Sequence, residues 1–270
     1  YCCIFNLPFA VFLLCHKQQP GFVVQICGFR YIFDGNNLVE YDENAGKVHI
    51  EIKGLNTTVR TSRFKNRTIL KDINIVIEPQ EMVAILGASG AGKSTLLGAL
   101  TGTRPATSGE ILVNGRNLYK EFSVFQLIMG YVPQDDIVHL DLTVREALTY
   151  SAFLRMPYDS SEEEIRHMVE EVMNELELTE CSNLRIKNLS GGQRKRVSIG
   201  VELLTKPGLF FLDEATSGLD PGLERVMMEL LRKLADGGRT ILLATHATLN
   251  IGLCDKVIFL TRHSRNQKGF

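Results

Sequence analysis

The chain contains 270 residues, of which 44% are hydrophobic and 23% are charged, and its formal net charge is -1 at pH 7. This composition is typical of a globular protein with one large domain, or one medium domain and a further fragment. The near-neutral charge argues against nucleic acid as a partner. The basic run at residues 194–196 is more typical of a solvated helix face.

Cysteine usage and hydropathy argue against further classes. The six cysteines are scattered without a CxxC pair, so the sequence predicts neither a zinc site nor a disulfide framework and fits a reducing cytosol. No apolar stretch reaches the ~18 to 20 residues of a membrane span, and the apolar segment at residues 1–15 lacks the basic start of a signal peptide. Because the chain has no initiator methionine, we interpret it as a fragment of a longer protein.

The first predicted elements are β-strands. Residues 29–33 and 38–41 flank a turn-forming segment, Asp34 to Asn37, which indicates a hairpin. Residues 47–52 and 73–77 alternate between apolar and polar side chains, which predicts half-buried antiparallel strands. Residues 110–113 predict another strand, which ends at Asn114 and Gly115.

A glycine-rich loop joins a buried strand at residues 82–86 to a helical segment at residues 95–100. Its glycines let the backbone wrap an anion, the helix N-terminus directs positive partial charge at that anion, and Lys93 adds a full charge. The hydroxyl of Ser94 is placed to bind Mg2+. The pattern predicts a nucleotide phosphate site that comprises Gly87, Ala88, Ser89, Gly90, Ala91, Gly92, Lys93, Ser94 and Thr95.

The chain becomes mostly helical near Leu142 and stays so to about residue 189. A capping box of Ser161 and Glu164 starts an amphipathic helix there. Two apolar runs at residues 209–212 and 240–245 then flank a helical segment at residues 223–235, which predicts a parallel sheet. Residues 257–260 add a strand, and a polar tail follows.

Polar residues follow both of these buried strands, at the sheet edge where ligands bind. We expect Asp213 to hold Mg2+ through water and Glu214 to polarise a water for in-line attack on the terminal phosphate. A surface acidic pair is the alternative interpretation. His246 ends the second strand within reach of the γ-phosphate, although a histidine at a strand end is often merely structural.

The run Leu189-Ser190-Gly191-Gly192-Gln193 predicts a second phosphate-binding helix start, with Ser190 as the N-cap. One chain needs only one cradle for the γ-phosphate, and the loop at residues 87–94 already provides it. We therefore expect the second cradle to serve a nucleotide held by another copy, in a head-to-tail homodimer with two shared sites.

These motifs together resemble the nucleotide-binding domain of an ATP-binding cassette (ABC) transporter. The order is Walker A at residues 87–94, a Q-loop at 131–134, the LSGGQ signature at 189–193, Walker B at 209–214, a D-loop at 217–220 and the H-loop at His246. The resemblance implies an α/β P-loop NTPase fold with a mixed parallel sheet core, an antiparallel β subdomain and a helical insert at about residues 142–189.

The resemblance also implies site residues and cofactors, namely ATP and Mg2+. Lys93, Glu214, His246 and Gln134 would be catalytic, with Gln134 also at the metal beside Ser94 and Asp213. The nucleotide would further contact Ser190, Gly191, Gly192 and Gln193 of the second copy, and Asp220 of the D-loop. Phe64, which precedes a strand at residues 69–77, would stack on adenine. A buried aromatic residue is the alternative interpretation of Phe64.

Residues around the motifs resemble the G-subfamily of half-transporters, which handle lipids, sterols and amphipathic drugs. Residues 142–157 and 194–200 carry this likeness, whereas Asp220-Pro221 and residues 245–248 resemble bacterial relatives with a preceding forkhead-associated (FHA) domain. We expect residues 1–46 to be the remnant of such a β domain, 47–262 to form the cassette, and 263–270 to be a polar tail.

The predicted function is ATP hydrolysis that powers export of an amphipathic or lipid-like substrate. The cassette would lie on the cytoplasmic face of a membrane, bound to a transmembrane domain outside this chain. Two alternatives stay open at this point: a soluble ABC ATPase acting on nucleic acid or the ribosome, and an isolated cassette fragment that only binds ATP.

Overall fold

The computed structural model describes residues 23–26, 29–33, 38–41, 47–62, 65–156 and 160–261. The first three ranges are strands β1 (Val23–Ile26), β2 (Phe29–Phe33) and β3 (Leu38–Tyr41), which form a small antiparallel sheet. Phe33 pairs with Leu38, so the predicted hairpin strands are confirmed, while the turn between them lies outside the described residues. The FHA origin of this segment stays a prediction.

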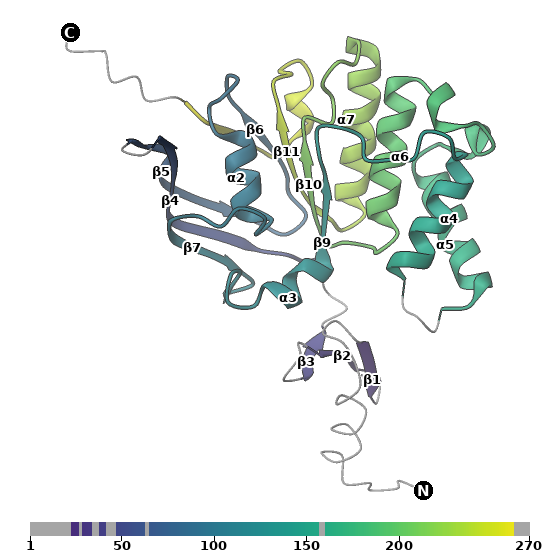
Figure 1. The fold of residues 1–270 in the computed structure, drawn as a ribbon, viewed down its shortest axis with the longest axis horizontal. Coiled ribbons are helices and arrows are strands. Elements are labelled where there is room, and N and C mark those ends of the chain that lie inside the picture. Colours follow the sequence, from purple (N-terminus) through teal and green to yellow (C-terminus); the bar gives the residue numbers. More distant parts are fainter. Residues whose placement is uncertain are drawn as a thin grey trace, which may run out of the picture.

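A parallel sheet forms the centre of the larger, C-terminal part of the chain, with the strand order β12-β6-β11-β10-β9 (Figure 1). Every residue of β6, β10 and β11 is buried, as their continuous apolar sequences predict. The neighbours pair in parallel register, which confirms the sheet, although β9 was not predicted. The strands are β6 (Met82–Leu86), β9 (Met129–Val132), β10 (Leu209–Asp213), β11 (Thr240–Thr245) and β12 (Lys256–Phe259).

A second, antiparallel sheet has the order β5-β4-β7-β8. Its two long strands are β4 (Ile50–Ser62) and β5 (Lys65–Ile77), and β7 (Ser108–Val113) and β8 (Arg116–Asn117) complete it. Helix α2 (Lys93–Leu100) contacts both sheets, and its leucines share one hydrophobic cluster with them (Figure 1). The phosphate loop is therefore held by two sheets.

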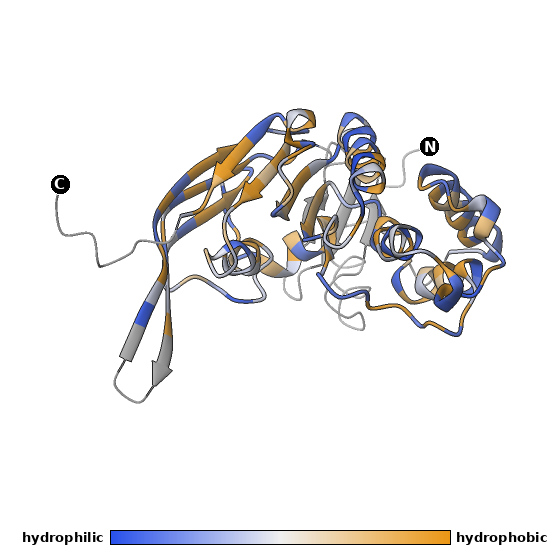
Figure 2. Cartoon of the chain, turned by 90° about the horizontal axis from the view of Figure 1, so that it is seen from above, coloured by the Kyte–Doolittle hydropathy of each residue, from blue (hydrophilic) through white to orange (hydrophobic). Residues whose placement is uncertain are grey.

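Helices cover the opposite face of the parallel sheet. Alternate residues of β10 and β11 contribute to a second cluster with α4 (Val144–Arg155), α5 (Glu162–Glu175), α6 (Gly191–Leu203) and α7 (Pro221–Asp236). The helices in Figure 2 carry both hydrophobic and hydrophilic residues, and in α5 and α7 the buried residues recur at helical spacing on one face. The predicted capping box of Ser161 and Glu164 is present. No helix among the described residues is long and apolar enough to span a membrane.

Shorter elements connect these layers. They are helix α3 (Phe122–Phe125) and the 3-10 turns η2 (Gln126–Ile128), η3 (Thr179–Cys181), η4 (Ile186–Asn188) and η5 (Ile251–Leu253). The carboxyl ends of β6, β9, β10 and β11 lead directly to Gly87, Pro133, Glu214 and His246. The parallel sheet thus brings four motifs that are distant in sequence to one edge.

Candidate nucleotide-binding site

Two glycines of the phosphate loop have backbone conformations that other residues rarely adopt. Gly90 and Gly92 have φ of 74° and 110°, in the left-handed region that disfavours other residues. A Cβ at Gly92 would also lie 3.1 Å from side-chain atoms of Ile69 and Leu70. Helix α2 begins with Gly92 as N-cap, without a side-chain cap and without an acidic residue in its first turn. Its positive end therefore has no counter-charge from its own first turn and suits an anion.

A cavity of about 340 Å³ opens at this helix start. The last two residues of the loop, Lys93 and Ser94, line it together with Gln134 from the segment after β9 and Glu214 from the segment after β10. The lining also includes two residues of β5 that the motifs do not contain, Arg67 and Ile69. Ile69 is the first residue of the strand expected at residues 69–77, whereas Arg67 lies before that strand and no pattern in the sequence marks it. The remaining lining residues are Ser89, Gly90, Gly92 and Thr95.

Lys93, Glu214 and His246 form one cluster at this cavity. The ammonium of Lys93, only 5% exposed, donates to Gly87 O at 2.8 Å and lies 3.2 Å from His246 Nδ1 and 3.8 Å from Glu214 Oε1. His246 Nε2 is 2.5 Å from the same Glu214 oxygen. Because an ammonium only donates, Nδ1 accepts and Nε2 carries the proton that Glu214 accepts. The structure thus brings together three of the residues predicted to be catalytic.

The backbone holds Glu214 in an unusual conformation. Its φ is 54°, in a region that costs a non-glycine residue about 1–2 kcal/mol. The N–H of Glu214 donates to Ala244 O at 2.8 Å, and Thr216 Oγ1 lies 3.1 Å from Thr245 Oγ1 in the buried interior. These bonds tie the segment after β10 to the end of β11, so the strained turn is fixed and Glu214 faces the cavity.

Asp213 fits a metal-associated role. It is 5% exposed, and its Oδ1 has no hydrogen-bond partner among the described residues. Burial raises the pKa of Tyr131, and the Asp213 carboxylate raises it further, so this phenol stays protonated beside the carboxylate. The described residues contain no group of three His, Cys, Asp or Glu side chains able to hold a metal. Mg2+ would need nucleotide oxygens besides Asp213, Ser94 and Gln134, which suits an ion that commonly binds with substrate phosphates.

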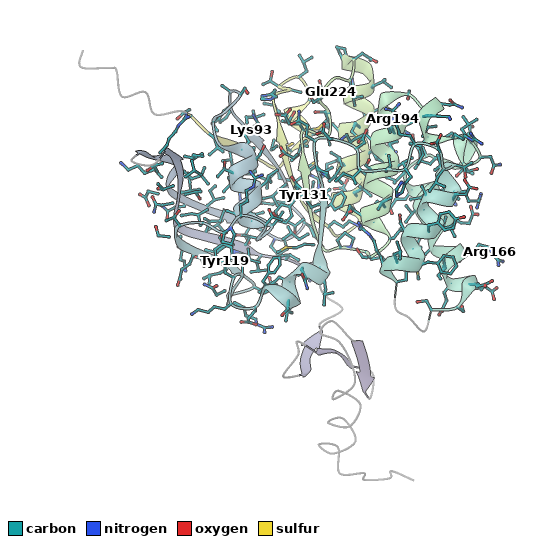
Figure 3. The ribbon with its side chains drawn as sticks, viewed as in Figure 1. Lys93, Tyr119, Tyr131, Arg166, Arg194 and Glu224 are labelled. Atoms are coloured by element: carbon teal, nitrogen blue, oxygen red, sulfur yellow. The ribbon has the colours of Figure 1, made fainter. Side chains whose placement is uncertain are left out.

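The signature segment lies apart from this cavity. Ser190 caps α6, and its hydroxyl and backbone N–H form a capping box with the backbone and side chain of Gln193. A Cβ at Gly191 or Gly192 would meet only Leu219 Cδ2, at 3.9 Å. None of these residues lines the cavity of the same chain. Figure 3 shows Lys93 and Arg194, near the starts of α2 and α6, well apart along one edge of the molecule.

Two further predicted residues have different outcomes. Asp220 is the N-cap of α7, where its side chain accepts hydrogen bonds from the backbone of Gly222 and Leu223, each at 3.0 Å. This contact gives Asp220 a local structural role, and its contact with nucleotide stays a prediction. Phe64 lies outside the described residues.

The expectation that residues 194–196 form a solvated face is wrong. Lys195 is 7% exposed, and its ammonium lies 2.8 Å from Asp136 Oδ1 and 2.8 Å from Gln134 O. Arg196 is also largely covered, with a side chain 13% exposed that donates to Leu176 O. The physical reason is that α6 packs on the Q-loop and on α5. The aliphatic parts of Lys195 and Arg196 are therefore covered by neighbouring residues, and their charged groups contact oxygen atoms.

Comparison with known proteins now gives the family. The family model described as "ABC transporter" matches residues 70–217. The chain belongs to the ABC transporter family. As such it is an ABC-type ATPase cassette, which agrees with the loop, the cavity and the charged cluster described above.

Relatives of this ABC cassette include transporters of the G type. It is 40% identical over 245 residues to an ABC transporter ATP-binding/permease protein of Mycobacterium tuberculosis, covering 90% of this chain and 28% of that protein. It is 42% identical over 188 residues to ABC transporter G family member 13 of Arabidopsis thaliana, covering 67% of this chain and 27% of the relative. The cassette therefore spans less than a third of the length of either relative.

Solved ABC cassettes share the fold. A dimeric, post-hydrolysis cassette bound to ADP and Pi has a TM-score of 0.69 and 27% identity, and the match covers 82% of this chain and all of that one. The protein cbiO1 of Clostridium perfringens, part of an ABC transporter complex, has a TM-score of 0.70 and 30% identity over 78% of this chain and 84% of its own. The α/β cassette architecture expected from the motifs is thus confirmed.

Proposed function

We propose that this chain hydrolyses ATP to power export of an amphipathic or lipid-like substrate by an ABC transporter. The observation that carries the proposal is the Lys93, Glu214 and His246 cluster at the start of α2. A triphosphate in this cavity would meet a positive helix end, a buried ammonium and the carboxylate of Glu214, which the His246 imidazole contacts.

The cluster supports defined roles for its members. Glu214 contacts both His246 and Lys93, so an incoming γ-phosphate competes with the carboxylate for the ammonium. The released Glu214 oxygen can then accept a proton from the attacking water, and His246 can donate to the phosphoryl group. Bound Mg2+ would neutralise charge on the phosphate oxygens. Lys93 stabilises the charge that develops on the phosphoryl group as the bond to ADP breaks.

The second part of the proposal is that two copies share each nucleotide. The separation of the signature segment from its own cavity supports this, as does the exposure of Gly191, where an added Cβ would meet only one side-chain atom, at 3.9 Å. One solved relative, the cassette bound to ADP and Pi, is itself dimeric. In this arrangement residues 190–193 of one copy would close the cavity of the other.

The third part is that a transmembrane domain receives the motion, with the cassette on the cytoplasmic face. The names of the relatives, including an ATP-binding/permease protein, support this partner. Exposed apolar side chains on α4 and ahead of it offer a contact surface, with Ile137 80%, Phe153 54% and Leu154 87% exposed. The resemblance to G-family proteins favours an amphipathic substrate.

The test is the ATPase rate of the 270-residue chain as a function of its concentration. A composite site requires two copies, so turnover per chain should rise with protein concentration at the dilute end and then level off. Glu214→Gln should reduce that turnover while ATP binding remains. A chain with no ATP turnover at any concentration, in the presence of Mg2+, would contradict the proposed function.

A further inference from the structure

A buried ionic contact joins the segment after β9, which contains Gln134 and Asp136, to α6, the signature helix that begins after Ser190. Lys195 projects from α6, one and a half turns after the Ser190 cap. Its ammonium lies 2.8 Å from Asp136 Oδ1, 2.8 Å from Gln134 O and 3.4 Å from Pro133 O. The side chains of Lys195 and Asp136 are only 8% and 21% exposed. One cation therefore gathers three oxygens of a single loop.

The acidic partner of this contact is itself fixed to the same helix. Ser198 Oγ donates to Asp136 Oδ1 at 3.1 Å, one turn further along α6. The loop that begins after β9 is thus held to α6 by both its backbone carbonyls and its carboxylate. Since the contact is covered, displacing the loop alone would leave a buried ammonium without its acceptors, which is costly.

The loop also reaches the nucleotide cavity. Gln134 lines the cavity with Lys93 and Glu214, while its backbone carbonyl accepts from Lys195. The residue that faces the ligand therefore receives a hydrogen bond from the helix that carries the signature segment. The path from the cavity to Ser190 therefore passes through the Lys195 side chain and the first one and a half turns of α6.

We propose that Lys195 is a positioning residue that couples occupancy of the nucleotide cavity to the position of the signature helix, through its contact with Asp136 and the carbonyls of residues 133 and 134. This inference rests on the proposed role of the cavity in ATP binding. Lys195 touches no reacting atom. It makes the Q-loop and the start of α6 move as one body, so that ligand at Gln134 biases the helix that the second copy needs.

The test is hydrogen–deuterium exchange of the 270-residue chain with and without a non-hydrolysable ATP analogue and Mg2+. The protein is kept below the concentration at which turnover per chain rises, so that contacts from a second copy do not contribute. In the wild type, the analogue should slow exchange both at residues 87–95 and at residues 190–197. Lys195→Gln should keep the first effect and lose the second.

A matched control uses another lysine–aspartate pair. Lys187 lies 2.8 Å from Asp141 Oδ1, the same distance, but these side chains are 45% and 85% exposed. Lys187→Gln should preserve both protections. The affinity of Lys195→Gln for the analogue should lie within about threefold of the wild-type value. Its steady-state kcat for ATP should fall about tenfold, the size of a typical coupling between sites.

Ser198→Ala provides a milder variant if Lys195→Gln does not fold, because it removes one support of Asp136 and keeps the ion pair. It should reduce the protection of residues 190–197 in part. Full protection of these residues in the lysine variant, or in Ser198→Ala where only that variant folds, overturns the proposal. Protection confined to residues 87–95 in the wild type also overturns it. Absence of protection at residues 87–95 in the wild type would instead count against the ATP site itself.

Discussion

The starts of α2 and α6 are both glycine-rich helix N-termini, but they are built differently. Gly92, the cap of α2, has φ of 110° and lies against Ile69 and Leu70, so the chain's own packing demands glycine. At α6, the cap is a side chain, Ser190, and a Cβ at Gly191 would lie 3.9 Å from its nearest neighbour. Nothing in the described part of the chain requires glycine there.

This difference indicates where each ligand contact comes from. The α2 start lies in a cavity with the buried ammonium of Lys93 and the cluster around it. The α6 start has no such surroundings among the described residues of its own chain. Its exposed Gly191 leaves room for a ligand held by a second copy. We therefore expect substitutions at the first to impair a single chain, and substitutions at the second to impair only the assembled pair.

The largest effect should come from Glu214→Gln at the α2 cavity. The amide cannot accept the proton of the attacking water, so turnover should fall by about 100- to 10,000-fold. Calorimetric ATP affinity should persist, since the loop and Lys93 are intact. Gel filtration with ATP should show more dimer than in the wild type. Turnover within a few fold of wild type would remove Glu214 from the role of base.

Lys93→Ala should act on binding itself. Loss of a charge-assisted contact to phosphate should weaken ATP binding by about 10- to 100-fold in calorimetry. Because Lys93 also contacts Glu214 and His246, thermal unfolding without nucleotide serves as the control. An unchanged ATP affinity in a folded variant would contradict the assignment of the cavity as the phosphate site.

Gly191→Glu at α6 sharpens the comparison. An acidic residue in the first helical turn is favourable by a few tenths of a kcal/mol, so the melting temperature should hold or rise slightly. Single-chain ATP affinity should be unchanged, because Gly191 does not line the cavity. Turnover at high protein concentration should fall about tenfold or more, since the carboxylate would repel the partner's nucleotide. A loss of ATP affinity in the dilute chain would contradict the claim that the α6 start does not contact the nucleotide bound to its own chain.

The smallest effect should come from Arg67→Ala. Arg67 lines the cavity from β5 and brings a positive charge to the place where an anionic ligand would bind. We expect ATP to bind about three- to tenfold more weakly, as for a partly exposed charged contact. Calorimetry on Arg67→Ala beside Lys71→Ala, an exposed position further along the same strand, measures this. Equal affinities for the two variants would exclude Arg67 from the site.

The site residues that could be predicted from the sequence are those that follow a recognisable strand along the chain. Lys93, Glu214 and His246 follow strands whose buried apolar runs are easily recognised, and parallel strands bring their carboxyl ends to one edge. Strand β9 was missed because it is only four residues long and contains a glycine, which is unfavourable inside a strand. Arg67 was missed because its role depends on how β5 lies against the loop, which no local pattern records.

Lys195 shows why the rest could not be predicted. A run of three basic residues on a helix is usually solvated, and nothing in the run distinguishes its middle member. Its burial arises from the docking of α6 on the segment after β9, where Gln134 and Asp136 lie far earlier in the chain. Long-range pairing of this kind is a property of the tertiary packing, since the two residues share neither motif nor secondary-structure element.

The central claim is that one chain provides only half of each ATP site, and mixing two variants that are impaired on opposite sides of the site tests it most directly. Lys93→Ala impairs the α2 side and Gly191→Glu impairs the α6 side. In a head-to-tail heterodimer the intact cavity of one copy meets the intact signature of the other. An equimolar mixture should therefore recover about a quarter of wild-type turnover, because half of the dimers are mixed and one of their two sites is whole. A mixture no more active than the average of its separate components would contradict the shared site.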